Sequence, residues 1–239
     1  MDVAKRFKDL NLNILKTIGQ GTYGNVYLCE NGKNQALQIV KDIEYKGRIQ
    51  DNGQDIANEV KILSSLKHPN IIEFYECCNV NNHVMIIMEY AASGNLAEYM
   101  YQRYPKLIEQ QKTSTVIGTP FYLAPELCEG ELYDTKSDIW ALGCLLYEMC
   151  THRRAFDAET LVGLVKVITQ GSVHPIDLNI YERGMQDLID AMLSILPDKR
   201  PSVKELMGRM ILLPVIYDVF LDAGNDDLLL LKAKNFINM

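Results

Sequence analysis

The sequence predicts an α+β protein in which a β-rich N-terminal lobe is followed by a helical lobe. In the first ninety residues apolar side chains alternate with polar ones, which is typical of strands, whereas from Asp138 onward they recur at helical spacing. One helix is expected in the first part, because Ile56, Val60 and Leu63 recur at i, i+4 and i+7. A chain of 239 residues is long enough for two small lobes.

Short strands are expected on both sides of that helix. They are predicted over residues 12–18, 26–29, 35–43, 70–77 and 83–90. Asn31-Gly32 is a turn signal, and residues 79–82 would close a hairpin. The helix should end near His68-Pro69, because a residue that precedes proline is disfavoured in helical conformation.

The second part is predicted to be helical. Residues Asp138–Cys150 are apolar on nearly every face, which predicts a helix that is buried all round. Further helices are expected over 158–169 and 184–196, the latter stopping at Pro197. The aliphatic tail over 211–239, with Leu228–Leu231, could pack on the helical lobe or dock a partner, and the sequence does not choose between these.

Charge and composition exclude several classes of protein. A net charge of −7 argues against a broad nucleic-acid-binding surface. The N-terminus, Met1 to Lys8, is charged and lacks the apolar core of a secretory signal, and no apolar run is long enough to cross a bilayer. Six cysteines without a C-x-x-C pair predict free thiols in a reducing compartment. We therefore expect a cytoplasmic protein with a protein substrate or partner, no nucleic acid and no membrane insertion.

A glycine-rich turn is the first sign of chemistry. Residues 19–26 read G-Q-G-T-Y-G-N-V and follow a predicted strand. Glycines at these positions let backbone N–H groups approach phosphate oxygens that side chains would otherwise block. A dinucleotide-binding turn would lead into a helix, but a strand follows here. A phosphate cover over a hairpin is favoured, and a plain tight hairpin is the alternative.

Five later stretches carry a family resemblance. They read E-V-K-I-L-S-S-L-K-H-P-N-I-I from Glu59, M-I-I-M-E-Y-A-A-S-G-N-L over 85–96, T-S-T-V-I-G-T-P-F-Y-L-A-P-E over 113–126, S-D-I-W-A-L-G-C-L-L-Y-E-M over 137–149 and P-D-K-R-P-S over 197–202. In this order they resemble Ser/Thr protein kinases over about residues 10–210, most closely the NIMA-related kinases. The resemblance implies transfer of the ATP γ-phosphate to a protein hydroxyl, with magnesium.

The resemblance also implies a protein-kinase-like bilobal fold. It would consist of an N-terminal extension over 1–11, a β-rich N-lobe with one αC helix over 12–90, an incomplete helical C-lobe over 91–210 and a tail over 211–239.

Specific residues inherit roles from the resemblance. The nucleotide site would contain Ile18, Gly19, Gly21, Gly24, Val26, Ile39, Lys41 and Glu59, with the backbone of Glu89 and Ala91 bonding adenine. Met88 would be the gatekeeper. Thr115 would be the activating phosphosite, and Thr119 would contact the substrate. Glu126 and Arg200 would form a buried structural ion pair.

Two registers compete for the strand lysine that holds the α- and β-phosphates. Lys41 lies fifteen residues after Val26 and eighteen before Glu59, spacings that match the family without gaps. Alternatively, Ala36-Leu37-Gln38 mimics the A-x-K pattern and puts Gln38 in the lysine position. Positions 38 and 41 face opposite sides of a strand, so only one can point toward the nucleotide. The gap-free spacing favours Lys41 as the phosphate-binding lysine. The alternative is that Lys41 is exposed to solvent at the edge of the sheet and has no role in nucleotide binding.

The sequence lacks both segments that perform catalysis in the family. It contains neither H-R-D-L-x-x-x-N, which supplies the catalytic base, nor D-F-G, which holds magnesium. Between Tyr104 and Thr115 the chain passes from L-I-E-Q-Q, which resembles the start of helix αE, to K-T-S-T, which resembles a late activation segment. About fifty to sixty residues of the family pattern are missing there. No catalytic residue and no metal ligand can be assigned, and binding of ATP and Mg²⁺ by this chain is therefore doubtful.

Loss of αE should also leave the apolar helix over 138–150 partly bare. A clean excision between intact motifs favours an omitted exon or a faulty gene model. The alternative is a true inactive product, a pseudokinase that binds partners.

We predict that the genomic interval interrupting the codons near residue 110 encodes an in-frame H-R-D and D-F-G segment. The reason is the abrupt junction between an αE start and a late activation segment. Sequencing the transcript and the locus across codons 104–115 tests this. A continuous exon, with no such coding sequence nearby, would favour the true inactive product.

Overall fold

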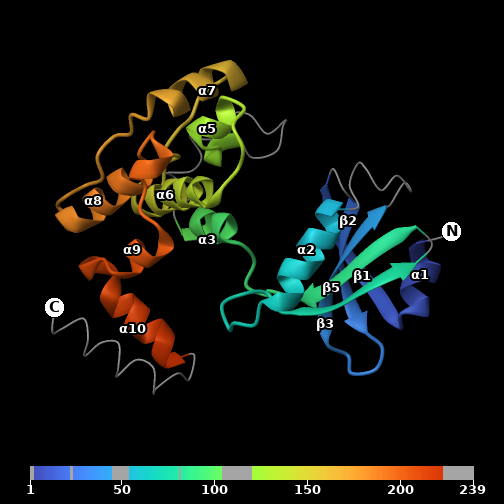
Figure 1. Cartoon of the computed structure of the whole chain (residues 1–239). Coiled ribbons are helices and arrows are strands. Elements are labelled where there is room, and N and C mark those ends of the chain that lie inside the picture. Colours follow the sequence, from blue (N-terminus) through green and yellow to red (C-terminus); the bar gives the residue numbers. More distant parts are fainter. Residues whose placement is uncertain (1–2, 22–23, 45–53, 81, 104–119, 223–239) are drawn as a thin grey trace. The chain divides into compact units, whose positions relative to one another are not determined.

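A computed structural model describes residues 3–21, 24–44, 54–80, 82–103 and 120–222. The chain divides into two compact units, residues 1–94 and 95–239 (Figure 1). The first unit is built around a β-sheet and the second is helical, so the predicted α+β fold class is confirmed. None of the helices in the described parts of the chain combines the length and apolar character needed to cross a bilayer.

The first unit contains a five-stranded antiparallel sheet in the order β1-β2-β3-β5-β4. The strands are β1 (Leu12–Gly21), β2 (Gly24–Asn31), β3 (Leu37–Glu44), β4 (Phe74–Val80) and β5 (His83–Glu89), and helix α2 (Gln54–Ser65) lies between β3 and β4 in sequence. Strand β4 begins four residues later than the sequence predicts. His68 accounts for this, because its carbonyl and ring nitrogen accept from the N–H groups of Ile71 and Asn70 and hold a turn.

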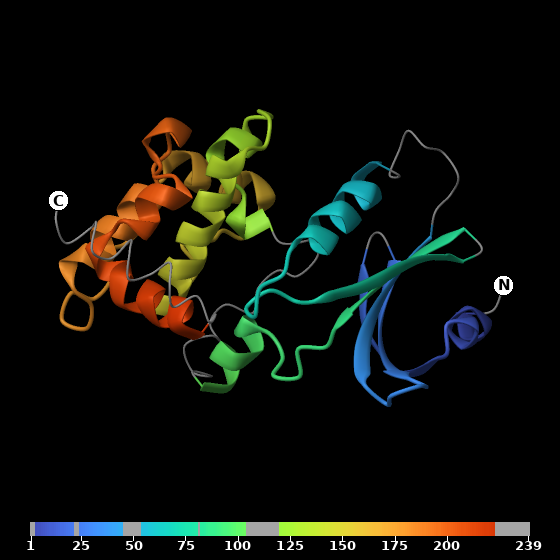
Figure 2. The same cartoon turned by 60° about the horizontal axis from the view of Figure 1, so that its bottom comes forward.

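An additional helix, α1 (Val3–Asp9), covers the face of the sheet opposite α2 (Figures 1 and 2). Its Phe7 is 1% exposed and meets Tyr27 of β2 edge-on, with ring centroids 5.0 Å apart. Arg6 of the same helix is buried and donates to Asp42 of β3 at 2.7 Å. Residues 3–9, expected only as an N-terminal extension, thus form a helix that contributes Phe7 and Arg6 to the buried interior of the first unit.

The second unit is assembled around helix α6 (Thr135–Thr151) (Figure 2). The other elements are α3 (Leu96–Arg103), η3 (Pro120–Tyr122), α5 (Pro125–Cys128), α7 (Leu161–Gln170), α8 (Arg183–Met192), η4 (Pro197–Lys199), α9 (Val203–Met207), η5 (Met210–Leu212) and α10 (Leu213–Asp222). Asp134 begins α6 with a capping box that includes Ser137. Helix α6 packs against α8, η3 and η4.

Gly143 lets helices α6 and α8 approach closely. A Cβ at this position would lie 2.9 Å from atoms of Met192 and Leu193. Helix α8 ends at Met192, four residues before the predicted end. The carbonyls of Ser194 and Ile195 instead accept hydrogen bonds from a buried arginine, which explains why the helix does not continue.

Helix α6 is not buried all round, which corrects the prediction made from its apolar composition. Trp140 and Cys144 are 0% and 1% exposed, but Leu142 and Met149 are 47% and 38% exposed. Leu145, on the same side, is half-buried. In the part of the chain that the structure describes, one face of this helix is therefore exposed.

Candidate functional site

The glycine-rich turn joins β1 and β2. Gly19 pairs with Val26 across the ladder, and Gly21 pairs with Gly24. Gly24 has a φ of +149°, and a Cβ there would lie 2.0 Å from the carbonyl oxygen of Asp42. The close approach of strand β3 therefore requires glycine at this position, independently of any phosphate.

Lys41 of β3 meets Glu59 of α2. Its Nζ lies 2.7 Å from Oε1 and 3.0 Å from Oε2 of the carboxylate. The two side chains are 29% and 39% exposed, so the pair contributes only about 0–1 kcal/mol to stability. Its value lies in fixing the direction of the lysine side chain.

Gln38 points to the other side of β3. It is buried and accepts a hydrogen bond from Asn31 Nδ2 at 3.4 Å. Alternation along the strand puts it on the same face as Val40, which belongs to the core cluster beneath α1. The structure thus brings Lys41, and not Gln38, to Glu59.

The other residues expected around a nucleotide are arranged along the same ladder. Val26 pairs with Lys41, and Ile39 pairs with Met88 of β5, so these side chains share the face that carries Lys41. Ile39 is buried, whereas Ile18 of β1 is 46% exposed.

The two hinge residues follow at the end of β5. The backbone N–H of Glu89 donates to the carbonyl of Glu73 at 2.8 Å, and its carboxylate accepts from the N–H of Glu73 at 3.0 Å. Ala91 is exposed, and its carbonyl accepts from the N–H of Gly94 at 3.3 Å. These contacts define the path of the chain where it leaves the sheet.

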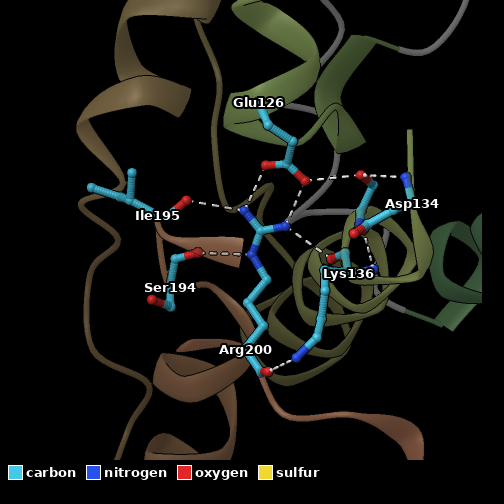
Figure 3. Close-up of polar contacts among 7 residues, drawn as sticks. Glu126, Asp134, Lys136, Ser194, Ile195 and Arg200 are labelled. Carbon is cyan, nitrogen blue, oxygen red and sulfur yellow. Dashed lines mark hydrogen bonds and ion pairs between the residues drawn. The ribbon is translucent and has the colours of Figure 1, made fainter. Parts of the chain in front are cut away.

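The second unit contains a buried ion pair between Glu126 of α5 and Arg200, just after η4 (Figure 3). Both carboxylate oxygens accept from the guanidinium at 2.7 Å, which is bidentate geometry. The remaining three N–H groups donate to the carbonyls of Ser194, Lys136 and Ile195 at 2.8, 2.9 and 3.1 Å. All five N–H donors of Arg200 are therefore satisfied.

Residues at the start of α6 complete this network. Ser137 Oγ donates to Glu126 Oε1 at 2.8 Å, and Lys136 Nζ donates to the carbonyl of Arg200. The guanidinium also lies 5.0 Å from the ring centroid of Trp140. The network was expected only as a pair, and its backbone carbonyl partners could not be identified from residue types.

The pKa of Glu126 is lowered from its ordinary value. Burial acts to raise it, but hydrogen bonds from Arg200, from the backbone and from Ser137 outweigh burial. The ionised carboxylate is the form that the folded chain stabilises.

Two residues with roles expected from the resemblance have no described location. Thr115 and Thr119 lie outside the described residues. Within the part of the chain that the structure describes, no three histidine, cysteine, aspartate or glutamate side chains are grouped so that they could hold a metal ion.

We predict that Glu126→Ala lowers the free energy of unfolding by about 3–5 kcal/mol, because it leaves the Arg200 guanidinium buried without its partner. Chemical denaturation at pH 7 measures this. The matched control is Asp187→Ala, which removes an exposed pair with Arg183 (73% and 55% exposed) and should cost less than about 1 kcal/mol. Equal effects of the two changes would contradict a structural role for the buried pair.

The Glu126–Arg200 pair should also make the stability of the folded chain depend on pH in the acidic range. The pKa of Glu126 is lower in the folded chain than the value of about 4.3 expected in the unfolded chain. Its contribution is therefore complete above pH of about 4.3 and is lost as the pH falls through the folded pKa. In Glu126→Gln this part of the pH dependence should disappear, which thermal unfolding across pH 3–6 would show. An unchanged acid profile in the variant would exclude Glu126 as its source.

Comparison with known proteins agrees with these features. The protein kinase domain family matches in two segments, residues 12–111 and 104–210. The chain is 34% identical over 265 residues to the serine/threonine-protein kinase Nek8 of Danio rerio, covering 88% of this chain and 38% of that protein. It is 28% identical to Nek5 of Mus musculus (83% and 40% covered) and 30% identical to nekl-2 of Caenorhabditis elegans (90% and 78% covered).

The chain thus spans about two fifths of the length of the first two relatives. The family match extends over most of the 239 residues, and it includes both the glycine-rich hairpin and the Glu126–Arg200 network. The chain therefore belongs to the protein kinase family, and within it to the NIMA-related Ser/Thr kinases.

Proposed function

We propose that this chain is a non-catalytic member of the Ser/Thr kinase family. The observation that carries the proposal is that its 239 residues contain neither H-R-D-L-x-x-x-N nor D-F-G, although recognisable kinase motifs stand on both sides of the place where these belong. As an enzyme of this family it would phosphorylate protein Ser or Thr with ATP. In this chain the groups for that reaction are incomplete.

The sequence lacks chemical groups that phosphate transfer requires. Without the loop aspartate, no group orients the acceptor hydroxyl or accepts its proton. Charge that builds on the γ-phosphate oxygens would meet only the ammonium group of Lys41. Because preorganised electrostatic stabilisation is usually the largest catalytic contribution, one lysine does not replace the lost groups.

The residues present would fit ATP in part, and among the described residues no group of three acidic, histidine or cysteine side chains could hold magnesium. The β1–β2 turn with Gly19, Gly21 and Gly24 would cover the phosphates, and Lys41, held by Glu59, would contact them. By the family pattern, adenine would be surrounded by Ile18, Val26, Ile39 and the backbone of Glu89 and Ala91. In the family, the strand after the catalytic loop forms the floor under adenine, and the sequence lacks it. We therefore expect weak ATP binding and assign no magnesium ligand.

A second candidate function is that of a pseudokinase interaction module. The complete hydrogen bonding of Arg200 supports it, because the end of the activation segment is anchored without the catalytic loop. On this proposal Thr119 to Glu126 receive a protein partner, and phosphorylation of Thr115 would modulate it. We expect the protein to act in the cytoplasm on proteins rather than on nucleic acid.

The 239-residue chain should transfer no phosphate to protein and should bind ATP poorly. Isothermal titration with ATP and magnesium, beside a radiolabel transfer assay on a generic protein substrate, measures both properties. Lys41→Met is the control. Transfer above that control would overturn the proposal, and micromolar ATP binding would show that the first unit retains a nucleotide site by itself.

Restoring the catalytic segment should restore the importance of Lys41. In a chain that carries the corresponding segment of a NIMA-related kinase, Lys41→Met should abolish transfer, because Lys41 is the cation that Glu59 directs. Gln38→Met should leave most of the activity, because Gln38 is buried on the opposite face of β3. Reversed outcomes in the same assay would show that the alternative register is correct.

A further inference from the structure

A pocket of the second unit lies where the start of α6, η4 and α9 meet, and we name it the α6–α9 pocket. Its volume is about 350 Å³. This is at the lower end of the range of roughly 300–1,000 Å³ that is usual for small-molecule sites, so the pocket can hold one charged group and the atoms that carry it. Its lining consists of Lys136, Asp198, Lys199, Arg200, Pro201, Glu205 and Arg209.

The buried network around Arg200 fixes one wall of this pocket. The Nζ of Lys136 donates to the carbonyl of Arg200, which ties the first turn of α6 to the chain after η4 (Figure 3). The guanidinium of Arg200 is itself neutralised by Glu126. Arg200 therefore contributes a fixed wall to the pocket and no unmatched charge.

The remaining charges of the lining are mainly positive. Lys199 and Arg209 are exposed, and among the described residues neither side chain has a hydrogen-bond or ion-pair partner. With Lys136 they make three cations, against the two carboxylates of Asp198 and Glu205. The pocket thus has an excess of positive charge in a chain whose net charge is −7.

One of the two carboxylates shows how the pocket acts on an anion. The pKa of Glu205 is lowered, first by hydrogen bonds from Ser202 and further by the charges of Lys136 and Arg209. The backbone N–H and Oγ of Ser202 donate to this carboxylate at 2.7 and 2.8 Å, within the capping box of α9. Because Ser202 supplies its hydrogen bonds, the N–H donors of Lys199 and Arg209 are available to a second anion.

The cations of the pocket suit a phosphate monoester. The planar guanidinium of an arginine matches two phosphate oxygens, and a lysine adds a compact positive charge. A phosphate monoester carries a charge of about −1.5 to −2 at pH 7 and three acceptor oxygens, which is more than a carboxylate offers. Nucleic acid has one charge per phosphate and is usually bound along a broad basic surface, which the negative net charge argues against.

We propose that the α6–α9 pocket binds a phosphate monoester, with Lys199 and Arg209 as its donors and Lys136 beside them. A phosphorylated side chain of a partner protein and free phosphate share this chemistry, and the experiment distinguishes these two sources. Neither candidate function above uses this pocket. The proposal therefore goes beyond them, and its failure would leave both unaffected.

Fluorescence anisotropy on the full chain tests the proposal. The probe is a fluorescein-labelled peptide with one phosphoserine among glycine and alanine residues, and the same peptide with serine is the reference. The phosphopeptide should bind and the reference should not. Lys199→Ala and Arg209→Ala should each weaken binding about tenfold, because each removes a charged hydrogen-bond donor. The matched control is Lys204→Ala, an exposed lysine of α9 outside the pocket lining, which should have little effect.

Thermal unfolding separates a loss of binding from a loss of folding. Since the three substituted side chains are exposed, all variants should unfold at the temperature of the parent chain. If Arg209→Ala unfolds earlier, Arg209→Gln, which keeps most of the side-chain length, replaces it.

Competition with inorganic phosphate identifies the source of the phosphate group. A phosphopeptide that binds at least about tenfold more tightly than free phosphate would assign the pocket to a phosphorylated protein, because the peptide then contributes contacts of its own. Equal affinities would assign it to free phosphate. Both results retain the proposed chemistry.

Three results would overturn the proposal. The first is phosphopeptide binding that neither Lys199→Ala nor Arg209→Ala weakens. The second is a folded chain that binds neither the phosphopeptide nor inorganic phosphate at about 1 mM. The third is a single-stranded oligonucleotide that binds more tightly than the phosphopeptide and loses affinity in the same variants, which would assign the pocket to nucleic acid.

Discussion

The buried ion pair between Glu126 and Arg200 holds together the segments from which the helical unit is built. The guanidinium joins α5, the first turn of α6 and the chain between α8 and η4, and it does so with every N–H donor used. A buried charge is tolerated only when it is paired and hydrogen-bonded, so the carbonyls of Ser194 and Ile195 must face the arginine rather than extend α8. All of these partners lie after residue 120. The Glu126–Arg200 network can therefore form entirely from residues that follow the junction near residue 110.

The order and type of most elements could be predicted from the sequence, because their apolar periodicities are local. Helix α1 was missed, although Val3, Phe7 and Leu10 recur at i, i+4 and i+7, because the frequent charges of residues 2–9 suggest a solvated extension. Its stability depends on Tyr27 and Asp42, which are distant in sequence. Apolar composition alone predicted that α6 is buried all round, and only the missing family segment indicated a partly bare helix. Periodicity shows which residues are apolar but not which of them have a neighbour to pack against.

In the candidate site, the alternation of side chains along β3 identifies the lysine more reliably than motif matching does. Once Glu59 is positioned on α2, only one of Lys41 and Gln38 can face it, and the hydrogen-bonded ladder determines which. The glycine pattern predicted a phosphate cover, with a plain tight hairpin as the alternative, and the structure gives Gly24 a steric reason of its own in the carbonyl of Asp42. When one backbone packs closely against another, the sequence shows only the glycine and not the neighbouring chain that requires it. The sequence could therefore not separate the two reasons.

Stability and chemistry occupy different parts of this chain. Among the described residues, the Lys41–Glu59 pair lies before the junction near residue 110, and the Glu126–Arg200 network lies after it. The catalytic groups of the family belong instead to one continuous stretch, so a single omission removes the base and the metal ligands together. The same omission takes away a helix that would pack on α6. On our proposal, the loss of phosphate transfer and the open face of α6 therefore have a common origin.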